Sequence, residues 1–410
     1  MKVRSDPMRG LVVLFNLLPG LVNIITGLLM FISAKRMAES GANSFMIAAT
    51  MTMWALFYAL TAFGLGFVLT KRNAVRVLLT GQTVLLVSLL GLMLVPGVTA
   101  QYFWLAGTGI GTATFFTAFQ AVVKLFGKEE YALESVVRKT AVYTMSWSFG
   151  LATGPLLAAF VWGLFSPENG WRYCYAITVG MVLFNIVSLT LMNRFVKARL
   201  AELGEADGKP ASPVIPPEQA GLPDLIIASW GAAILSGSVV AMMRTQIPDY
   251  CTNVLKWDTY KQGIILALIS YAQAFAGLAC WKARTWQYRP WVFGITAAGG
   301  ICALAVFLFS QSWSAYLISA LLLGIFYGVF YFTSTFHALI NPEKSARYAA
   351  GNETIVGMTS TLAPVLAGLS AMWFGASFPF VLGIALLAGA ALFFLWRTLS
   401  VKGAVRRTGQ

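Results

Sequence analysis

Uncharged polar and aromatic side chains recur inside the long apolar stretches of this chain. Amides offer both hydrogen-bond donors and acceptors, and aromatic rings offer flat apolar area, so together they could bind a hydroxylated or amphipathic neutral solute. Taken singly, each residue is also typical of interhelical hydrogen bonding or aromatic packing. The candidate binding residues are Asn16, Asn23, Gln120, Trp147, Trp230, Gln273, Tyr327 and Tyr331.

Two Glu-x-x-x-Arg segments carry the second candidate chemistry, Glu134 to Arg138 and Glu343 to Arg347. Glu four residues before Arg forms a same-face ion pair on a helix. Together with the basic loop at Lys71 and Arg72, these pairs could form a cytoplasmic latch that opens when the cavity opens inward. The alternative is a set of surface ion pairs, worth about 0 to 1 kcal/mol each.

The segment WSFGLATGP (147–155) brings Gly150 and Gly154 to one helix face and ends at Pro155. Small residues let helices approach closely in lipid, and proline loosens the backbone ladder. We therefore expect either a smooth surface on which one half of the protein rocks against the other or ordinary tight packing. TSTLAPVLAG (359–368), with Pro364, is the counterpart in the second half.

Titratable groups are scarce at the expected membrane midplane, because the 15 Asp and Glu residues fall in expected loops or helix ends. Glu353 and His337 are the nearest candidates for proton coupling. Glu353 could point into a cavity or pair with Arg347 or Lys344 at the membrane surface, and His337 could carry a proton or cap its helix. Arg244 is expected at the outer end of its helix, as an interfacial anchor or an attractor of anions.

The elements that must position these residues are membrane-spanning helices. The chain has 410 residues, of which 58% are hydrophobic and 11% charged, a balance that excludes a typical soluble domain. Apolar runs of about 20 residues suit α-helices that cross a bilayer. We predict an all-α membrane protein with twelve such helices, near 10–33, 45–69, 77–95, 101–126, 140–164, 173–192, 224–243, 262–281, 290–309, 314–338, 352–374 and 377–396.

Positive charge indicates the orientation. With both termini cytoplasmic, all but six of the 29 Lys and Arg residues fall on the inside, as the positive-inside rule requires. The net charge of +14 is thus explained by topology, and no nucleic-acid partner is expected. The six exceptions are Lys35, Arg36, Arg172, Arg244, Lys256 and Lys261.

One long polar stretch, 193–223, contains four prolines before Leu222 and mixed charge. Such a composition is typical of a linker. We expect an N-terminal six-helix bundle over 1–192, a cytoplasmic linker over 193–223, and a C-terminal six-helix bundle with a short basic tail over 224–410. An offset of 209 residues matches Glu134 with Glu343 and Pro155 with Pro364, which indicates two pseudo-symmetric halves.

Twelve helices in two halves, a central linker and Gly-x-x-x-Gly-Pro in helix 5 resemble the major facilitator superfamily. Gly66 and Lys71 also fit that family's loop signature, whereas Thr70 stands at its acidic position, and Ala158 and Ala159 replace the glycine pair typical of drug exporters. The resemblance implies two bundles around a central cavity lined by helices 1, 4, 7 and 10, with helices 2, 5, 8 and 11 at the interface between halves.

We therefore expect a secondary active or facilitative transporter, not an enzyme, that moves a small neutral polar organic solute by alternating access. The alternatives are a proton-coupled exporter of amphipathic compounds and a transporter-like receptor or assembly protein without transport. The four cysteines are scattered and no nucleotide-binding or zinc motif occurs, so no cofactor or metal is expected. The expected partners are the solute, the lipid bilayer and, for a coupled mechanism, protons. We expect a monomer in a bacterial inner membrane.

Overall fold

The computed structural model describes residues 7–69, 73–123, 133–165, 169–206, 223–282, 286–340 and 345–408. Within these ranges, some helical residues are described by their backbone alone: 7–13, 15–16, 120–123, 133–136, 139, 194–206, 345–347, 349–350 and 402–408.

Twelve α-helices make up nearly all of the described chain. In chain order they are α1 (Pro7–Glu39), α2 (Ser44–Val68), α3 (Ala74–Leu94), α4 (Ala100–Val123), α5 (Leu133–Leu164), α6 (Gly170–Ala206), α7 (Ile226–Asn253), α8 (Thr259–Ala279), α9 (Pro290–Phe309), α10 (Trp313–Leu339), α11 (Ser345–Phe374) and α12 (Phe378–Thr408). Two short 3-10 helices, η3 (Cys280–Lys282) and η4 (Trp286–Tyr288), lie between α8 and α9.

The ends of several helices follow from local chemistry. The side chains of Asn43 and Asp258 cap α2 and α8 by accepting hydrogen bonds from backbone N–H groups three residues later, at 2.9 and 2.8 Å. Gly41 and Gly375 have φ values of 78° and 99° in the turns after α1 and α11, a conformation that glycine adopts readily. Helix α9 begins with Pro290, which needs no hydrogen-bond partner for its nitrogen at that position.

Eleven of the described helices are long and apolar enough to cross a membrane. Helix α4 is the exception, although its 24 residues give it a similar length. It carries polar residues such as Thr108 and Thr112, which are buried and hydrogen-bond to the helix backbone. Packing between α2 and α3 removes its polar groups from lipid, so low hydropathy is compatible with this position.

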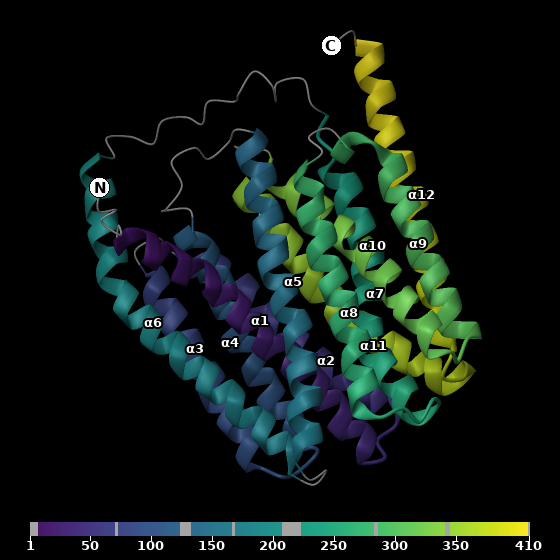
Figure 1. Ribbon diagram of the computed structural model, residues 1–410. Helices are drawn as coiled ribbons and strands as arrows, with labels where there is room; N and C mark the ends of the chain where they lie inside the picture. The colour runs from purple at the N-terminus through teal and green to yellow at the C-terminus, as the bar shows by residue number, and fades with distance from the viewer. Residues whose placement is uncertain are drawn as a thin grey trace, which may run out of the picture.

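The helices pack mainly within two sets, which we name the first helix group (α1–α6) and the second helix group (α7–α12). The groups meet chiefly where α5 packs on α8 and α2 packs on α11, with further contacts between α1 and α7 and between α5 and α10. In Figure 1, α3 and α6 lie at one side and α9 and α12 at the other. Helix α1 begins and α12 ends at the same end of the bundle, here called the terminal end; the opposite end is called the far end.

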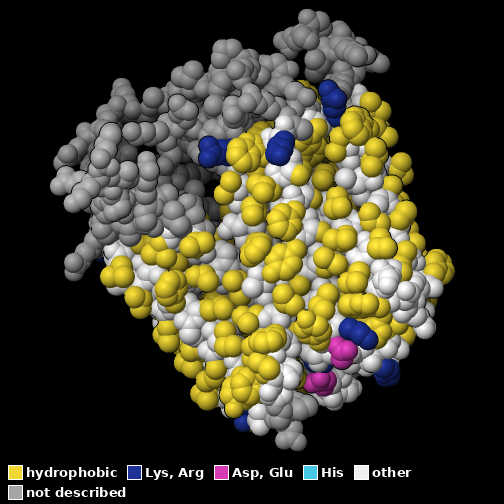
Figure 2. Space-filling model, in the orientation of Figure 1, with side chains coloured by type: hydrophobic (Ala, Val, Ile, Leu, Met, Phe, Trp, Pro, Cys, Tyr) yellow, Lys and Arg dark blue, Asp and Glu magenta, His cyan; other side chains and the backbone are white. Residues whose placement is uncertain are grey.

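The visible surface suits a lipid environment. Figure 2 shows hydrophobic side chains over the middle of the bundle, whereas the Lys, Arg, Asp and Glu side chains in view lie near its two ends. Large apolar side chains such as Phe67, Phe103 and Phe309 are at least 70% exposed. Lipid tails can cover these side chains as they would cover any apolar helix surface.

Several helices extend beyond their apolar cores. Helix α1 continues to Glu39, so Lys35 and Arg36 are buried helical residues and not part of an exposed loop as expected. Lys35 forms an ion pair with Glu39 at 2.7 Å, and the Arg36 guanidinium stacks 3.7 Å from the ring centre of Trp171. These partners explain how the two cations are accommodated inside the bundle.

The expected linker is also shorter than its sequence suggests. Helix α6 continues to Ala206, so the first residues of the 193–223 stretch are helical. The part of this stretch between residues 193 and 209 contains no proline, and its charged residues between 193 and 206 are compatible with a helix that leaves the apolar layer. Residues 207–222 lie outside the described ranges.

Candidate functional site

A pocket lies between the two helix groups. Its lining comes from α1 and α5 on one side and from α7, α8 and α10 on the other: Gly27, Met30, Phe31, Leu151, Pro155, Val240, Met243, Arg244, Ile247, Leu266, Ile269, Ser270, Gln273 and Tyr327. The cavity volume is about 40 Å³, which is room for a few water molecules at most. An organic solute would therefore need the lining to move apart.

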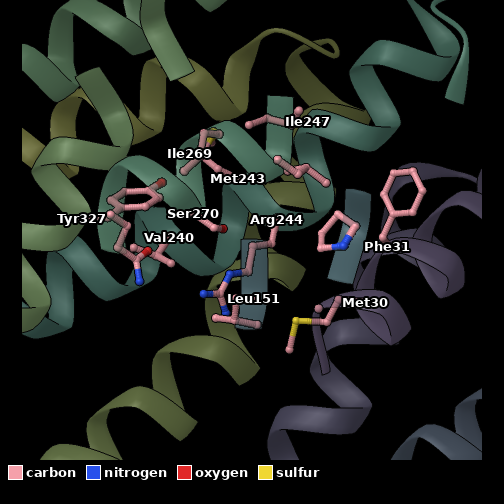
Figure 3. Close-up of a pocket in the computed structure, with 14 residues that line it drawn as sticks. Met30, Phe31, Leu151, Val240, Met243, Arg244, Ile247, Ile269, Ser270 and Tyr327 are labelled. Carbon is pink, nitrogen blue, oxygen red and sulfur yellow. The ribbon is translucent and has the colours of Figure 1, made fainter. Parts of the chain in front are cut away.

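Arg244 reaches into this pocket from α7. The helix continues to Asn253, nine residues beyond Arg244, which places this residue about 14 Å from the helix end. The expectation of an anchor at the outer helix end is therefore wrong, because it took the helix to end at residue 243. Figure 3 shows the side chain extending across the pocket toward Leu151 and Met30 of the first helix group.

A second, smaller pocket adjoins the first, and Arg244 and Met30 line both. It is bounded by α1, α2, α4 and α7 and includes the buried Trp54 Nε1, which has no hydrogen-bond partner within the described part of the chain. Arg244 thus lies where the two cavities meet.

Gln273 and Tyr327, two of the predicted binding residues, line the main pocket. Gln273 is 1% exposed, and its amide nitrogen donates a 2.7 Å hydrogen bond to Ser148 Oγ of α5. This bond joins the two helix groups. Tyr327 is also buried, but its hydroxyl has no hydrogen-bond partner among the described residues.

Trp147 and Tyr331, two further predicted residues, contact each other. Their rings meet edge to face with centroids 4.7 Å apart, a favourable aromatic geometry. Trp147 belongs to α5 and Tyr331 to α10, so this contact also crosses between the groups. Neither residue lines the two pockets described above.

The other predicted binding residues are not brought to this pocket. Asn23 is buried where α1 packs on Gly150 of α5. Trp230 packs on α11 beside Gly351, with its ring edge to face with Tyr348. Asn16 and Gln120 are helical, but their side chains lie outside the described part of the structure.

Of the two alternatives for the glycines of α5, the structure fits ordinary tight packing. Gly150 and Gly154 face α1 of the same group: an added Cβ would lie 2.3 Å from the Gly20 carbonyl oxygen and 2.5 Å from the Leu28 nitrogen. They therefore allow close packing within the first helix group and do not form its surface toward the second. Helix spacing placed the two glycines on one face, but it could not tell which helix that face meets.

Pro155 explains part of this packing. Proline has no N–H, so the carbonyl of Leu151 loses its helical hydrogen bond. A Cβ on Gly27 of α1 would lie 2.8 Å from that carbonyl oxygen. Gly27 is thus required for α1 to approach the proline-modified segment of α5, and Gly27, Leu151 and Pro155 together form one wall of the pocket.

Close packing between the two groups depends on other glycines. On α8, a Cβ at Gly263 would lie 2.4 Å from Ala159 Cβ of α5. On α11, Cβ atoms at Gly357 and Gly368 would lie 2.7 Å from Ala59 Cβ and 2.8 Å from the Ser44 carbonyl oxygen of α2. Pro364 is buried in this part of α11. The small residues of α11 therefore fit the expected smooth contact between the halves better than the glycines of α5 do.

Glu353 lies at the same α2–α11 contact. Its carboxylate accepts a 3.2 Å hydrogen bond from the hydroxyl of Tyr58, which belongs to α2. Glu353 lines neither pocket described above, and its hydrogen bond to Tyr58 crosses between the groups. The side chains expected to pair with it at the membrane surface lie outside the described part of the structure.

His337, the other candidate for proton coupling, is buried away from the pocket. Its ring meets Tyr288 and Phe336 edge to face, at centroid distances of 5.6 and 5.1 Å. It is 2% exposed and forms a hydrogen bond with the backbone of Gln287. Burial, together with the nearby charge of Asp224, raises the pKa of the Tyr288 hydroxyl, so this neighbour of His337 stays neutral at physiological pH.

Most of the expected latch cannot be placed. Lys71, Arg72 and Glu343 lie outside the described residues, as do the side chains of Glu134 and Arg347. Arg138 is described: its guanidinium lies 5.4 Å from the ring centre of Trp281 in η3. This cation–π contact joins α5 to the second helix group and was not anticipated from the sequence, because the two residues are far apart along the chain.

No three His, Cys, Asp or Glu side chains lie close enough to hold a metal ion within the described ranges. Cys174, Cys251 and Cys280 are buried free thiols, and Cys302 is an exposed one. The pocket instead offers one guanidinium, two hydroxyls, one amide and an apolar wall. These groups can bind and orient a solute, and they provide no nucleophile and base pair for covalent chemistry.

Comparison with known proteins agrees with this arrangement. A family model described as the Major Facilitator Superfamily matches residues 17–341. The curated proteins gave no match. Among solved structures, two crystal structures of a bacterial homologue of the human lysosomal transporter Spinster share the fold, one inward-facing and occupied and the other inward-facing and unoccupied.

The two solved structures are remote in sequence but similar in shape. The occupied form is 16% identical with a TM-score of 0.68, and the unoccupied form is 14% identical with a TM-score of 0.65. In both cases the alignment covers 97% of this chain and 98% of the other. The likeness therefore extends over the complete arrangement of helices.

Proposed function

Since the chain belongs to the major facilitator superfamily of membrane transporters, we propose that it moves a small organic solute across the membrane by alternating access. The observation that best supports this proposal is the pocket between the helix groups, because residues of both groups line it. Relative movement of the groups would open it to one side of the membrane and then to the other.

The contacts between the groups support a rocking movement. They are made by small residues on α8 and α11, by the Gln273–Ser148 hydrogen bond and by the Trp147–Tyr331 ring contact. Each is confined to one or two side chains, so its loss at one end of the bundle can be offset by contacts formed at the other. We propose that the first six and last six helices, over 1–192 and 224–410, are the two moving units.

A proton-coupled exporter is the second candidate, favoured by the Tyr58–Glu353 hydrogen bond across the groups. A proton on Glu353 removes the charge that strengthens this bond. Protonation would then weaken the α2–α11 contact and bias the equilibrium between the two states; a difference of about 1.4 kcal/mol shifts the populations tenfold.

A flux assay separates these functions. Compounds that raise the thermal unfolding temperature of the purified protein would be loaded, radiolabelled, into proteoliposomes, with and without a pH gradient. We expect saturable flux that empty liposomes lack. Dependence on the gradient, abolished in Glu353→Gln but kept in an Asp258→Asn control at the exposed cap of α8, would favour proton coupling. Binding without flux would contradict the transport proposal and favour a receptor role.

We further propose a monomer in a bacterial inner membrane with both termini cytoplasmic. The support for this orientation is the distribution of Lys and Arg along the chain. At the described far end, Asp258 and Glu39 lie beside Lys261 and Lys35, so positive charge there is partly neutralised, as the outer side of such a protein allows.

A further inference from the structure

The main pocket contains a positive charge and no negative one. Arg244 is the single cation in the described lining, and neither pocket that it borders includes an Asp or Glu. The nearest acidic residue in its own helix is Asp249, which already accepts a 2.5 Å hydrogen bond from Asn253. Glu353 is engaged with Tyr58 at the α2–α11 contact.

The second feature of Arg244 is the absence of a bonded partner in the described part of the chain. No hydrogen bond or ion pair joins its guanidinium to another of the described residues. This distinguishes it from Lys35, which pairs with Glu39, and from Arg36, which bonds to the Pro96 carbonyl and stacks on Trp171. An arginine inside a membrane costs several kcal/mol. The half-buried guanidinium of Arg244 has no such partner among the described residues, so it is available to a ligand.

A second polar group faces the same space. Tyr327 is 3% exposed, and its hydroxyl has no hydrogen-bond partner within the described part of the chain. It lines the pocket together with Arg244 and the hydroxyl-bearing Ser270, and it is within electrostatic reach of the guanidinium. Figure 3 shows the Tyr327 ring and Arg244 entering the pocket from different helices, α10 and α7.

We propose that the pocket binds an organic anion, with Arg244 as the counter-charge and the Tyr327 hydroxyl as a hydrogen-bond donor to the same anionic group. This inference rests on the proposed transport function and specifies its substrate class. A guanidinium offers several N–H donors in a plane that matches carboxylate and phosphate oxygens. Met30, Phe31 and Ile247 then give the apolar remainder of the solute a wall to pack on.

The sequence favoured a neutral solute because it placed no charge in the cavity. The position of Arg244 in the pocket removes that reason for a neutral solute. A neutral solute would leave the guanidinium unpaired in both the empty and the loaded protein, whereas an anion neutralises it during passage and reduces the cost of carrying a charge through the membrane interior. The anionic group could be a carboxylate or a phosphate ester, and the two are separate arms of the test.

The test compares anions with neutral compounds that have the same apolar body. Benzoate and benzamide, hexanoate and hexanamide, and phenyl phosphate and phenol would be titrated against the purified full chain, with binding measured by calorimetry and thermal shift. We expect at least one anion to bind, and its neutral partner to bind much more weakly. The Arg244→Gln variant should weaken anion binding roughly ten- to hundredfold, Arg244→Lys less, and Tyr327→Phe by a smaller factor.

A matched control removes a cation elsewhere. Arg172 is exposed at the far end, where it contacts Asn169 and Trp171, and Arg172→Gln should leave anion binding unchanged. Without ligand, Arg244→Gln should unfold at the same or a higher temperature than the wild type, because the charge stabilises no contact of the empty protein. A lower unfolding temperature together with unchanged anion affinity would show a structural role and overturn the proposal.

Failure of every anion to bind, or equal binding of the neutral partners, would also overturn it. If a neutral compound binds and crosses proteoliposome membranes, transport stands and the anion assignment fails. If an anion binds in an Arg244-dependent manner but no flux follows, the pocket assignment stands and transport fails.

Discussion

Two kinds of polar side chain lie between the helix groups: those that pair across the groups and those that are directed into the pocket. Gln273 and Ser148 form the clearest pair, because both are almost completely buried and their bond length is 2.7 Å. Arg244 and Tyr327 represent the second kind. The first kind stabilises one arrangement of the groups, and the second is available to whatever enters between them.

At this scale we predict that Ser148→Ala lowers stability. The substitution leaves the Gln273 amide nitrogen without its acceptor, and interhelical hydrogen bonds in membranes contribute about 0.6 kcal/mol on average, with losses of about 1 to 3 kcal/mol when a buried donor is orphaned. Thermal unfolding in detergent should show a decrease of roughly 2 °C. Ser238→Ala is the control, since Ser238 bonds only to its own helix, at the Ile234 carbonyl; equal decreases in both variants would contradict the prediction.

Glycine positions decide how closely the helices of the two groups approach. Gly368 of α11 meets backbone atoms of α2: an added Cβ would lie 2.8 Å from the Ser44 carbonyl oxygen and 3.0 Å from Phe45 Cα. These backbone atoms cannot move aside to make room for a Cβ, as the end of a flexible side chain could. The α2–α11 contact therefore has little tolerance for volume at this position.

We predict that Gly368→Val separates α2 from α11, with a stability loss of about 1 to 3 kcal/mol and at least a severalfold loss of flux. Gly64→Val in α2 is the control, because nothing lies within 4 Å of its added Cβ and valine suits a helix slightly better than glycine does. Thermal unfolding and proteoliposome flux would be measured for both. Normal behaviour of Gly368→Val would show that this contact is not required.

The whole molecule can alternate only if its two ends respond in opposite ways. Ser40 and Ala376 are exposed at the far end, in the first and second helix groups, and Asn73 and Lys282 occupy corresponding places at the terminal end. Because a rocking movement closes one end as it opens the other, ligand should change the two cross-group distances with opposite sign.

This prediction can be measured with spin labels on cysteines at each pair of positions. The background would have its four natural cysteines replaced, since Cys302 is exposed. Electron paramagnetic resonance should report one pair moving apart and the other moving together when a binding compound is added. A pair within one group, Ser40 and Asn73, is the control and should not change; parallel changes at both ends would exclude alternation.

The sequence alone determined the class of protein and the positions of its helices. Each of the twelve predicted apolar segments overlaps one α-helix of the structure, although several extend past a helix end by one to three residues. Hydropathy over about 20 residues is a local property of the sequence that determines whether a helix is stable in lipid. Membership of the major facilitator superfamily, indicated by helix number and by the Gly-x-x-x-Gly-Pro segment of helix 5, is confirmed by the match over residues 17–341. The roles of the individual site residues stay predictions.

Only the tertiary structure decided which faces meet and where charges can be placed. Gly150 and Gly154 share a face that the sequence identifies, but the rotation of α5 turns that face toward α1 and not toward the second group. The sequence placed Arg244 at the end of a membrane span because an isolated arginine is costly in lipid. In the structure α7 continues to Asn253, and the Arg244 side chain lies in a pocket between the groups and not in lipid. Periodicity defines the faces of a helix, and packing against distant parts of the chain determines what each face contacts.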